Sequence, residues 1–359
     1  MSAYRLYDTW FRVIRKLLPA ERITRVRNAV WMVIGLYLGQ SVHLARIASR
    51  LPVGDAKLPS TTDRFRRFLR NAAFRVRPWY RPLAERLLAE SALSGTVRLI
   101  LDGSKVGAGQ QLLLVAVAYR HRALPIAWTW VRGARGHSSA RQQVALLGYV
   151  HGLVPSGTSV QVVGDCEFGA IAVARQLQHW HWQYVLRQQG NTQVSVSSTA
   201  IVWRDLASLV PERETVVWYS HAIVTLKHLF HARLVGYWAA GEDDPWLLLT
   251  NLDDASAALR AYRRRMWIEE MFGDWKRHGV DLETTHLRHV LRLSRLVFLV
   301  AVLYLSLLDQ GARAIKAGKR PLVDRSDRRD LSIFRIGLYI VSRYLARNQR
   351  LTLHLVPWS

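Results

Sequence analysis

The sequence is poor in cysteine and in acidic residues. Its single cysteine, Cys166, cannot form an intramolecular disulfide, and the 13 histidines are not paired with cysteines at zinc-finger spacing. These absences argue against a disulfide-bonded scaffold and against a structural zinc site. The 26 Asp and Glu residues face 51 Lys and Arg residues, which gives a formal net charge of +25. A chain this positive attracts polyanions, and nucleic acid is the leading class of partner.

The sequence also lacks a long uninterrupted apolar run. The longest, within residues 296–308, is shorter than the ~18 to 20 residues that a membrane-spanning helix needs, so it predicts a buried core helix. The N-terminal stretch MSAYRLYDTWFRVIRKLLP has no apolar run followed by a small-residue cleavage site, so no secretory signal is expected. We therefore expect a cytoplasmic protein without a membrane partner, and an anionic membrane surface remains the competing hypothesis.

Residues 1–92 carry mostly helical patterns and predict a helical N-terminal DNA-binding region. Within it, residues 60–71 read STTDRFRRFLRN and predict an amphipathic helix that begins at Ser, Thr or Asp. Arg64 and Arg67 belong to the basic residues of this helix. Such a basic face suits contact with a DNA backbone, although a solvated charged face is the commoner meaning of the pattern.

From residue 93 onward the pattern changes to short apolar strands. Residues 93–187 predict the order βββαβαβ, which implies a mixed α/β sheet flanked by helices. Residues 188–255 are rich in Thr, Val and Trp and are too apolar to be disordered, so they predict a β-rich insertion. Residues 256–310 return to helical patterns and complete the core, and residues 311–359 form a C-terminal helical region.

Three acidic residues stand at positions that suit chemistry. Asp102 ends the apolar run LILD and Asp165 ends VVGD, and ligand groups gather at the carboxyl ends of parallel strands. The stretch YRRRMWIEEMFGDWK, residues 262–276, predicts one amphipathic helix in which Glu269, and not Glu270, shares a stripe with Arg265. The alternative is an ordinary surface ion pair between Arg265 and Glu269.

Three carboxylates that converge in a basic protein would repel one another without cations between them. Their hard oxygen ligands suit Mg²⁺ or Mn²⁺. Two such ions about 3.5 to 4 Å apart activate a water or a sugar hydroxyl and stabilise the leaving oxygen during attack at phosphorus. The three acids therefore predict a phosphodiester-cleaving site with two metal ions.

The same residues resemble a known family. Asp102 in LILDGSK, Asp165 in VVGDCEFG and the pattern Y-x2-R-x3-E-x6-K of residues 262–276 are similar to the bacterial insertion-sequence DDE transposases of the YREK subgroup. The resemblance covers residues from about 97 to about 285. It implies an RNase H-like core that is interrupted by the β-rich insertion before the last catalytic helix.

The resemblance also implies roles for single residues. The metal ligands would be Asp102, Asp165 and Glu269. The other members of the Y-x2-R-x3-E-x6-K pattern would contact phosphates near the cleaved end; they are Tyr262, Arg265 and Lys276. Trp246 matches the position of a tryptophan that stacks a flipped base in members that cut through a hairpin. The family often has Arg after the second Asp, and Cys166 departs from that, which leaves a local phosphate contact in doubt.

The resemblance implies a cut-and-paste transposase that binds terminal inverted repeats and target DNA, and that works as a homodimer holding two ends. Two other functions remain open from the residues. One is an RNase H-like DNA nuclease that cuts without joining strands. The other is a non-catalytic DNA-binding protein whose acids only balance charge.

Overall fold

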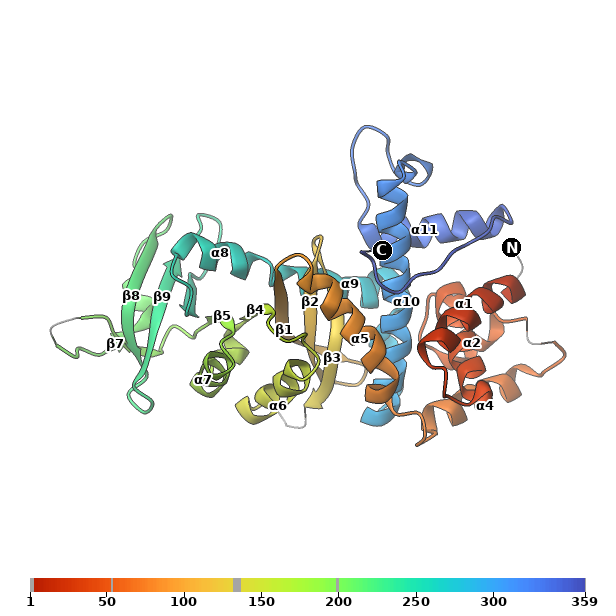
Figure 1. The fold of residues 1–359 in the computed structure, drawn as a ribbon, viewed down its shortest axis with the longest axis horizontal. Coiled ribbons are helices and arrows are strands. Elements are labelled where there is room, and N and C mark those ends of the chain that lie inside the picture. Colours follow the sequence, from red (N-terminus) through yellow and green to blue (C-terminus); the bar gives the residue numbers. More distant parts are fainter. Residues whose placement is uncertain (1–2, 53, 132–136, 198–199, 359) are drawn as a thin grey trace. The chain divides into compact units, whose positions relative to one another are not determined.

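Two groups of residues make most of their contacts among themselves in the computed structural model (Figure 1), which describes residues 3–52, 54–131, 137–197 and 200–358. The first unit comprises residues 1–90, 105–110 and 271–359. The second comprises residues 91–104 and 111–270. The first is helical and the second is built on a β-sheet.

Helix α10 forms the centre of the first unit. It packs against α2, α4 and α11, and α1 and α3 pack on α2. The helices of this unit are α1 (Ala3–Leu17), α2 (Ile23–Gly39), α3 (Leu44–Ser49), α4 (Leu58–Arg70), most of α5 (Val76–Ala92), α10 (Val290–Lys316) and α11 (Ile333–Ala346). The helix predicted over residues 60–71 corresponds to α4, which begins at Leu58, before the predicted start at Ser, Thr or Asp. Helix α4 begins after Lys57, whose side chain makes no cap hydrogen bond.

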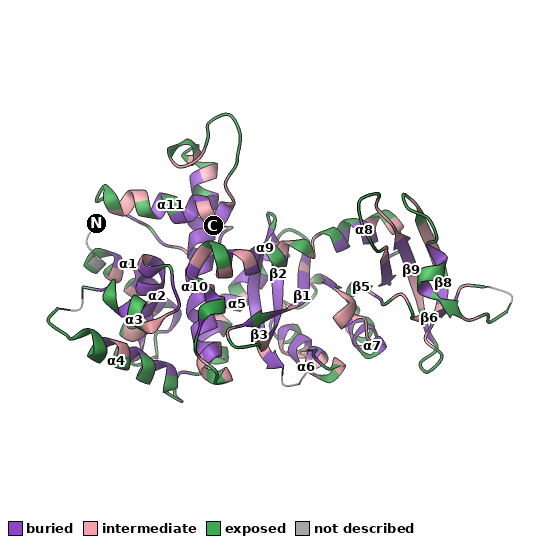
Figure 2. Cartoon of the chain, turned by 180° about the vertical axis from the view of Figure 1, so that it is seen from behind, coloured by how far each residue is buried: buried purple, intermediate pink, exposed green. Residues whose placement is uncertain are grey.

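Helix α10 is longer than the apolar run that predicted it. Its 27 residues are long and apolar enough to cross a membrane by length and composition, but 78% of the most apolar 18-residue window is buried inside the protein, as the burial colours show (Figure 2). The prediction of a buried core helix is confirmed, and the predicted length was too short. The helix continues because Ser306, Asp309 and Gln310 are themselves buried in it.

A ten-stranded sheet with the order β3-β2-β1-β4-β5-β10-β9-β8-β6-β7 forms the second unit. Strands β1, β4 and β5 run parallel, and β2 pairs antiparallel with β3. The strands of the core are β1 (Thr96–Val106), β2 (Gln110–Tyr119), β3 (Arg122–Val131), β4 (Ser159–Gly164) and β5 (Gln183–Arg187). Helix α6 (Ala140–His151) packs against β3, and α7 (Ile171–His179) packs against β5. The expected mixed sheet flanked by helices is confirmed.

The β-rich segment that follows β5 continues the same sheet. Strand β10 pairs antiparallel with β5 on one side and with β9 on the other. The strands of this segment are β6 (Gln193–Ser195), β7 (Arg204–Asp205), β8 (Val216–Val224), β9 (Phe230–Tyr237) and β10 (Trp246–Thr250). The predicted β-rich character is confirmed, and its strands extend the core sheet by main-chain hydrogen bonds.

The stretch 262–276 does not form one helix, so that prediction was wrong. Helix α8 (Ala255–Arg263) ends before Arg265, α9 (Met266–Trp275) begins after it, and a π-helical turn covers Lys276–Val280. At the junction the N–H of Arg265 donates to the carbonyl of Tyr262 at 2.9 Å. This is an i to i−3 bond, which tightens the chain locally. Asp254 caps the start of α8 by accepting from the N–H groups of Ser256 and Ala257.

Candidate active site

Parallel pairing brings Asp102 and Asp165 together. Strands β1 and β4 are in register as far as Leu101 and Gly164, so each aspartate is the next residue along its strand. Asp102 does not end its strand as predicted, because β1 continues to Val106. What ends after Leu101 is the pairing with β4. Asp102 therefore lies in β1 and Asp165 directly after β4, at the point where the pairing of the two strands ends.

Arg265 lies between these aspartates and Glu269. Its Nη2 atom is 3.6 Å from Oδ2 of Asp102 and 3.6 Å from Oδ2 of Asp165. Its Nη1 atom donates to Oε1 of Glu269 at 2.6 Å. One guanidinium therefore reaches all three predicted acids, and the three carboxylates converge as expected. The surface ion pair of Arg265 with Glu269 also exists, but it is one of three contacts.

Burial and charge shape the ionisation of this cluster. Burial raises the pKa of Asp102 to about 7; the charge of Arg265 and the Gly103 N–H lower it, and Asp165 and Glu269 raise it further. Burial alone would lower the pKa of Arg265, but its neighbours, Asp102 first, hold that pKa above its ordinary value. The pKa of Asp102 rises because burial and two like charges outweigh the single guanidinium. The pKa of Arg265 rises because the charges of its acidic neighbours outweigh burial.

The chemistry of the donor set suits divalent cations, although the described side chains are not arranged around a metal position in this structure. Carboxylate oxygens from three residues are hard ligands of the kind that Mg²⁺ and Mn²⁺ prefer, and one cationic group already contacts all three. Among the described residues, no group of three or more His, Cys, Asp and Glu side chains is arranged so that it could hold a metal ion. In this structure, Arg265 contacts the acids instead.

A hydrogen-bond network that the sequence analysis missed supports Asp165. The N–H of Glu167 donates to Oδ1 of Asp165 at 2.9 Å, and Oε1 of Glu167 accepts from the N–H and the hydroxyl of Ser138 at 2.7 and 2.5 Å. The fully buried Gln143 donates to the Glu167 carbonyl at 3.0 Å and to the Ser138 hydroxyl at 2.9 Å. The available signal was a second acid two residues after Asp165, in DCEF.

Tyr262 and Trp246 form an aromatic pair next to the acid cluster. Their ring centroids are 5.0 Å apart with an interplanar angle of 70°. Tyr262 is buried, and burial raises its pKa to about 12, against the charges of Arg265 and Arg187. Its hydroxyl therefore stays protonated at neutral pH. Trp246 begins β10, is half-buried, and also contacts the ring of Tyr237.

The other predicted site residues belong to the first unit. Lys276 belongs to the first unit and forms an ion pair of 2.7 Å with Glu283. Arg67 is exposed on α4, whereas Arg64 is half-buried, with its guanidinium 5.2 Å from the centre of the Phe65 ring. The Nε and Nη2 atoms of Arg64 are buried and lack hydrogen-bond partners among the described residues. Of the two, Arg67 is the one open to solvent.

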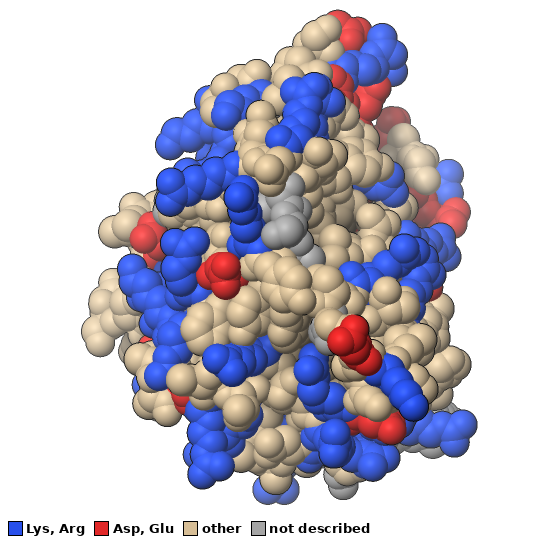
Figure 3. All heavy atoms as spheres, turned by 90° about the vertical axis from the view of Figure 1, so that its right-hand side faces the viewer, with Lys and Arg blue, Asp and Glu red and all other residues tan. Residues whose placement is uncertain are grey.

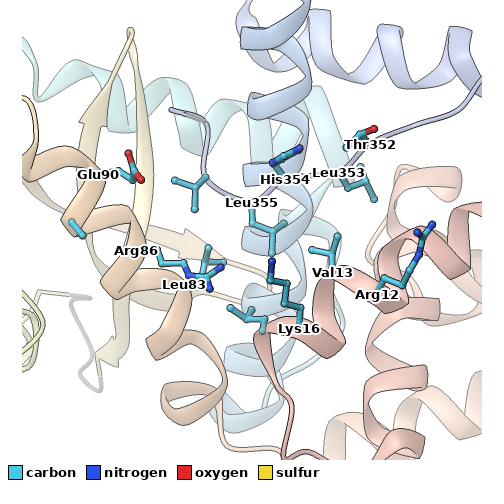
Figure 4. A pocket seen from close by; sticks show the side chains of 13 residues that line it. Arg12, Val13, Lys16, Leu83, Arg86, Glu90, Thr352, Leu353, His354 and Leu355 are labelled. Carbon is cyan, nitrogen blue, oxygen red and sulfur yellow. The ribbon is translucent and has the colours of Figure 1, made fainter.

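The first unit carries basic surface and a cavity of about 590 Å³. Figure 3 shows the side of the molecule that carries α1 to α4, where Lys and Arg side chains are widespread and acids are few. The cavity lies between α1, α5 and the segment 352–356 (Figure 4), and its basic lining residues are Arg12, Lys16, Arg86 and His354. None of the predicted site residues lines it.

Comparisons with known proteins give the family. Residues 98–306 match the family model described as the transposase DDE domain, and this span contains Asp102, Asp165 and Glu269. A comparison with curated proteins finds no match. Among solved structures, the chain is similar to one in the cryo-EM structure of the piggyBac transposase synaptic complex with hairpin DNA. The two share 11% identity with a TM-score of 0.45, over 97% of this chain and 80% of that one. Because the family model matches more than half of the 359 residues, the chain belongs to the transposase DDE domain family.

Proposed function

We propose that this protein is a DNA transposase that cleaves the ends of an insertion-sequence element and joins them to target DNA. The observation that carries the proposal is the convergence of Asp102, Asp165 and Glu269 around one guanidinium. Three carboxylates from two strands and a helix have no need to meet in a protein that only binds DNA. Membership of the family and the net charge of +25 support the same reading.

In this proposal, Asp102, Asp165 and Glu269 hold two Mg²⁺ or Mn²⁺ ions. Bound ions of this kind lower the pKa of an attacking water or hydroxyl and stabilise charge on the leaving oxygen. The chain's own contribution is orientation: the β1–β4 register fixes the two aspartates, and the Glu167 network holds the turn after Asp165. Arg265 and Lys276 would bind DNA phosphates by charge.

The reaction consists of two kinds of displacement at phosphorus. In cleavage, a water oxygen bonds to the phosphorus at the element end and the bond to the 3′ oxygen breaks, which frees a 3′-hydroxyl. In joining, that hydroxyl bonds to a target phosphorus and displaces a target 3′ oxygen. We propose a cut-and-paste pathway in which the freed hydroxyl first attacks the opposite strand and forms a hairpin. A second water would then cleave the hairpin phosphodiester and regenerate the 3′-hydroxyl that attacks the target.

The aromatic pair supports the hairpin step. We propose that a base flipped from the DNA end stacks on Trp246, which is half-buried beside Tyr262. Base stacking on an aromatic ring contributes ~1 to 3 kcal/mol per base. We further propose that the chain belongs to the YREK subgroup and acts in the cytoplasm as a homodimer holding two ends. The helical region of residues 1–92, with Arg67 exposed on α4, would bind the terminal inverted repeats.

A strand-joining assay tests the proposal. A labelled, precut element end is incubated with supercoiled plasmid and the full chain in Mg²⁺ or Mn²⁺. A transposase covalently joins the label to the plasmid, and the Asp102→Asn variant does not. Cleavage of an uncut end without any joining would instead identify a nuclease. DNA binding with neither reaction would identify a non-catalytic DNA-binding protein.

A further inference from the structure

Arg265 contacts more carboxylates than any other Lys or Arg whose ion pairs the structure describes. It contacts Asp102, Asp165 and Glu269 at 3.6, 3.6 and 2.6 Å, and no other Lys or Arg among those pairs meets three carboxylates. Its side chain is 16% exposed. A guanidinium is never deprotonated under ordinary conditions, so a permanent positive charge lies within the acid cluster.

The charges of the cluster indicate that Arg265 and divalent cations compete for the same three carboxylates. Three carboxylates with one guanidinium leave a net charge of about −2 when all acids are ionised. Two divalent cations would add four positive charges, and a fixed guanidinium beside them would repel both. A guanidinium that stays in contact with the carboxylates would therefore weaken the binding of metal ions there.

Arg265 lies in the short turn between α8, which ends at Arg263, and α9, which begins at Met266, so its own backbone is not part of a regular helix. Its Nε atom is buried and lacks a hydrogen-bond partner among the described residues. The terminal nitrogens are thus held by ion pairs, while the stem of the side chain has no hydrogen bond that fixes it in place.

We propose that Arg265 is the resident counter-cation of the metal-free site, which the divalent ions displace and which then becomes available to a DNA phosphate. This inference rests on the proposed function, because it takes the three acids to be metal ligands. It assigns to one residue two successive anionic partners: the acids before metal binding and the phosphate after it. The exchange couples metal loading to the capture of DNA.

Metal binding by the full chain without DNA tests the proposal. Mn²⁺ is titrated into the wild-type protein, Arg265→Gln and Arg264→Gln by calorimetry. Arg264 is the matched control because its charged neighbours include Arg98 and Arg260, and the structure describes no acid paired with it. We expect Arg265→Gln to bind Mn²⁺ about tenfold more tightly or better, and Arg264→Gln to bind like the wild type. In metal-free buffer, Arg265→Gln should have a lower Tm, with a larger rise on adding Mn²⁺.

Equal or weaker Mn²⁺ binding by Arg265→Gln would overturn the inference while leaving the proposed metal site intact. Absence of Mn²⁺ binding in every protein would overturn both the site and the inference. If Arg265→Gln does not fold, the wild-type chain provides a second measurement. Phenylglyoxal modification of Arg265, mapped by peptide mass, should increase when Mn²⁺ is added, with Arg264 as the internal reference. Unchanged modification of Arg265 would count against displacement.

Discussion

Two aspartates with the same raised pKa lie in very different surroundings. Burial raises the pKa of Asp102 in β1 and of Asp309 in α10 to about 7 in each case. Asp102 is surrounded by two more acids and Arg265. Asp309 is fully buried in a core helix, where one oxygen accepts from Gln310 at 3.2 Å and the other lacks a partner among the described residues.

The difference separates an acid within a cluster of acids from a single acid in a hydrophobic core. A raised pKa alone marks burial, and burial occurs in cores as well as in sites. Convergence of several acids on one cation, at the edge where parallel pairing ends, occurs only around Asp102 among the described acids with raised pKa values. The cluster, and not the shift, therefore identifies the chemistry.

The largest expected effect separates the two aspartates by activity. Asp102→Asn should lower the cleavage rate of a labelled element end by roughly 10³-fold or more, because a metal ligand and its charge are lost. Asp309→Asn should cleave at a rate within a few fold of the wild type. Mobility shift of the same DNA should show that both variants still bind. Equal loss of cleavage in both variants would break the comparison.

The second prediction concerns the contribution of Asp309 to stability. Since the folded pKa of Asp309 lies above its ordinary value of 3.8, the folded chain binds the extra proton, and the free energy of unfolding falls as pH rises from about 4 to about 7. In Asp309→Asn, this pH-dependent decrease in the free energy of unfolding should be absent. It should therefore be more stable than the wild type at pH 8, by on the order of a few kcal/mol, and gain little at pH 4.

Urea unfolding at pH 4, 6 and 8 measures this slope. Asp327→Asn is the control, because the bond from Arg325 lowers the pKa of that exposed carboxyl, so its contribution to stability is lost as pH falls. A wild-type slope that survives unchanged in Asp309→Asn would show that this aspartate does not cause the pH dependence.

The third prediction concerns the acid next to the cluster. Glu167→Ala removes the acceptor of both Ser138 hydrogen bonds and loosens the turn that positions Asp165. A small displacement of a reacting group costs up to about 100-fold, so we expect cleavage to fall by about 10- to 100-fold. Strand-transfer and cleavage rates are compared with those of Glu242→Ala, an exposed acid. A wild-type cleavage rate in Glu167→Ala would show that Glu167 does not support the site.

The smallest expected effect comes from the neighbour of Glu269. Glu270 pairs with Arg122 at 3.1 Å; the Glu270 side chain is 59% exposed and that of Arg122 is 10% exposed, and the structure describes no contact of Glu270 with Asp102, Asp165 or Arg265. Glu270→Gln should therefore leave the cleavage rate within about twofold, whereas Glu269→Gln should abolish cleavage. Comparable losses in the two variants would contradict the assignment of the site to Glu269 alone.

Much of the sheet was predictable because its signals are local. The apolar runs before Asp102 and Asp165 are strands in the structure, and the order βββαβαβ follows from alternating patterns. The break at Arg265 was not predictable, because residues 262–269 contain neither Pro nor Gly and the phase of a single helix fits them. Tertiary packing decides that junction.

Contacts between distant residues were the other limit. The sequence allowed Arg265 to pair with Glu269 by helical spacing, but its contacts with Asp102 and Asp165 require the folded sheet. Asp309 follows directly after the apolar run of residues 296–308, and its burial has no sequence signal. The bond from Ser138 to Glu167 spans 29 residues and could not be read from spacing.

The pairing of β10 with β5 has a consequence for how this transposase can be shortened. Strand β5 has β4 on one side and β10 on the other, and three of its five residues are fully buried. Deleting residues 188–252 would leave its N–H and C=O groups on that side without partners. Unprotected apolar edges of this kind recruit strands from other chains. A chain shortened in this way should therefore aggregate unless β5 receives a replacement neighbour, so we expect the segment to be needed for the fold as well as for any contact with DNA.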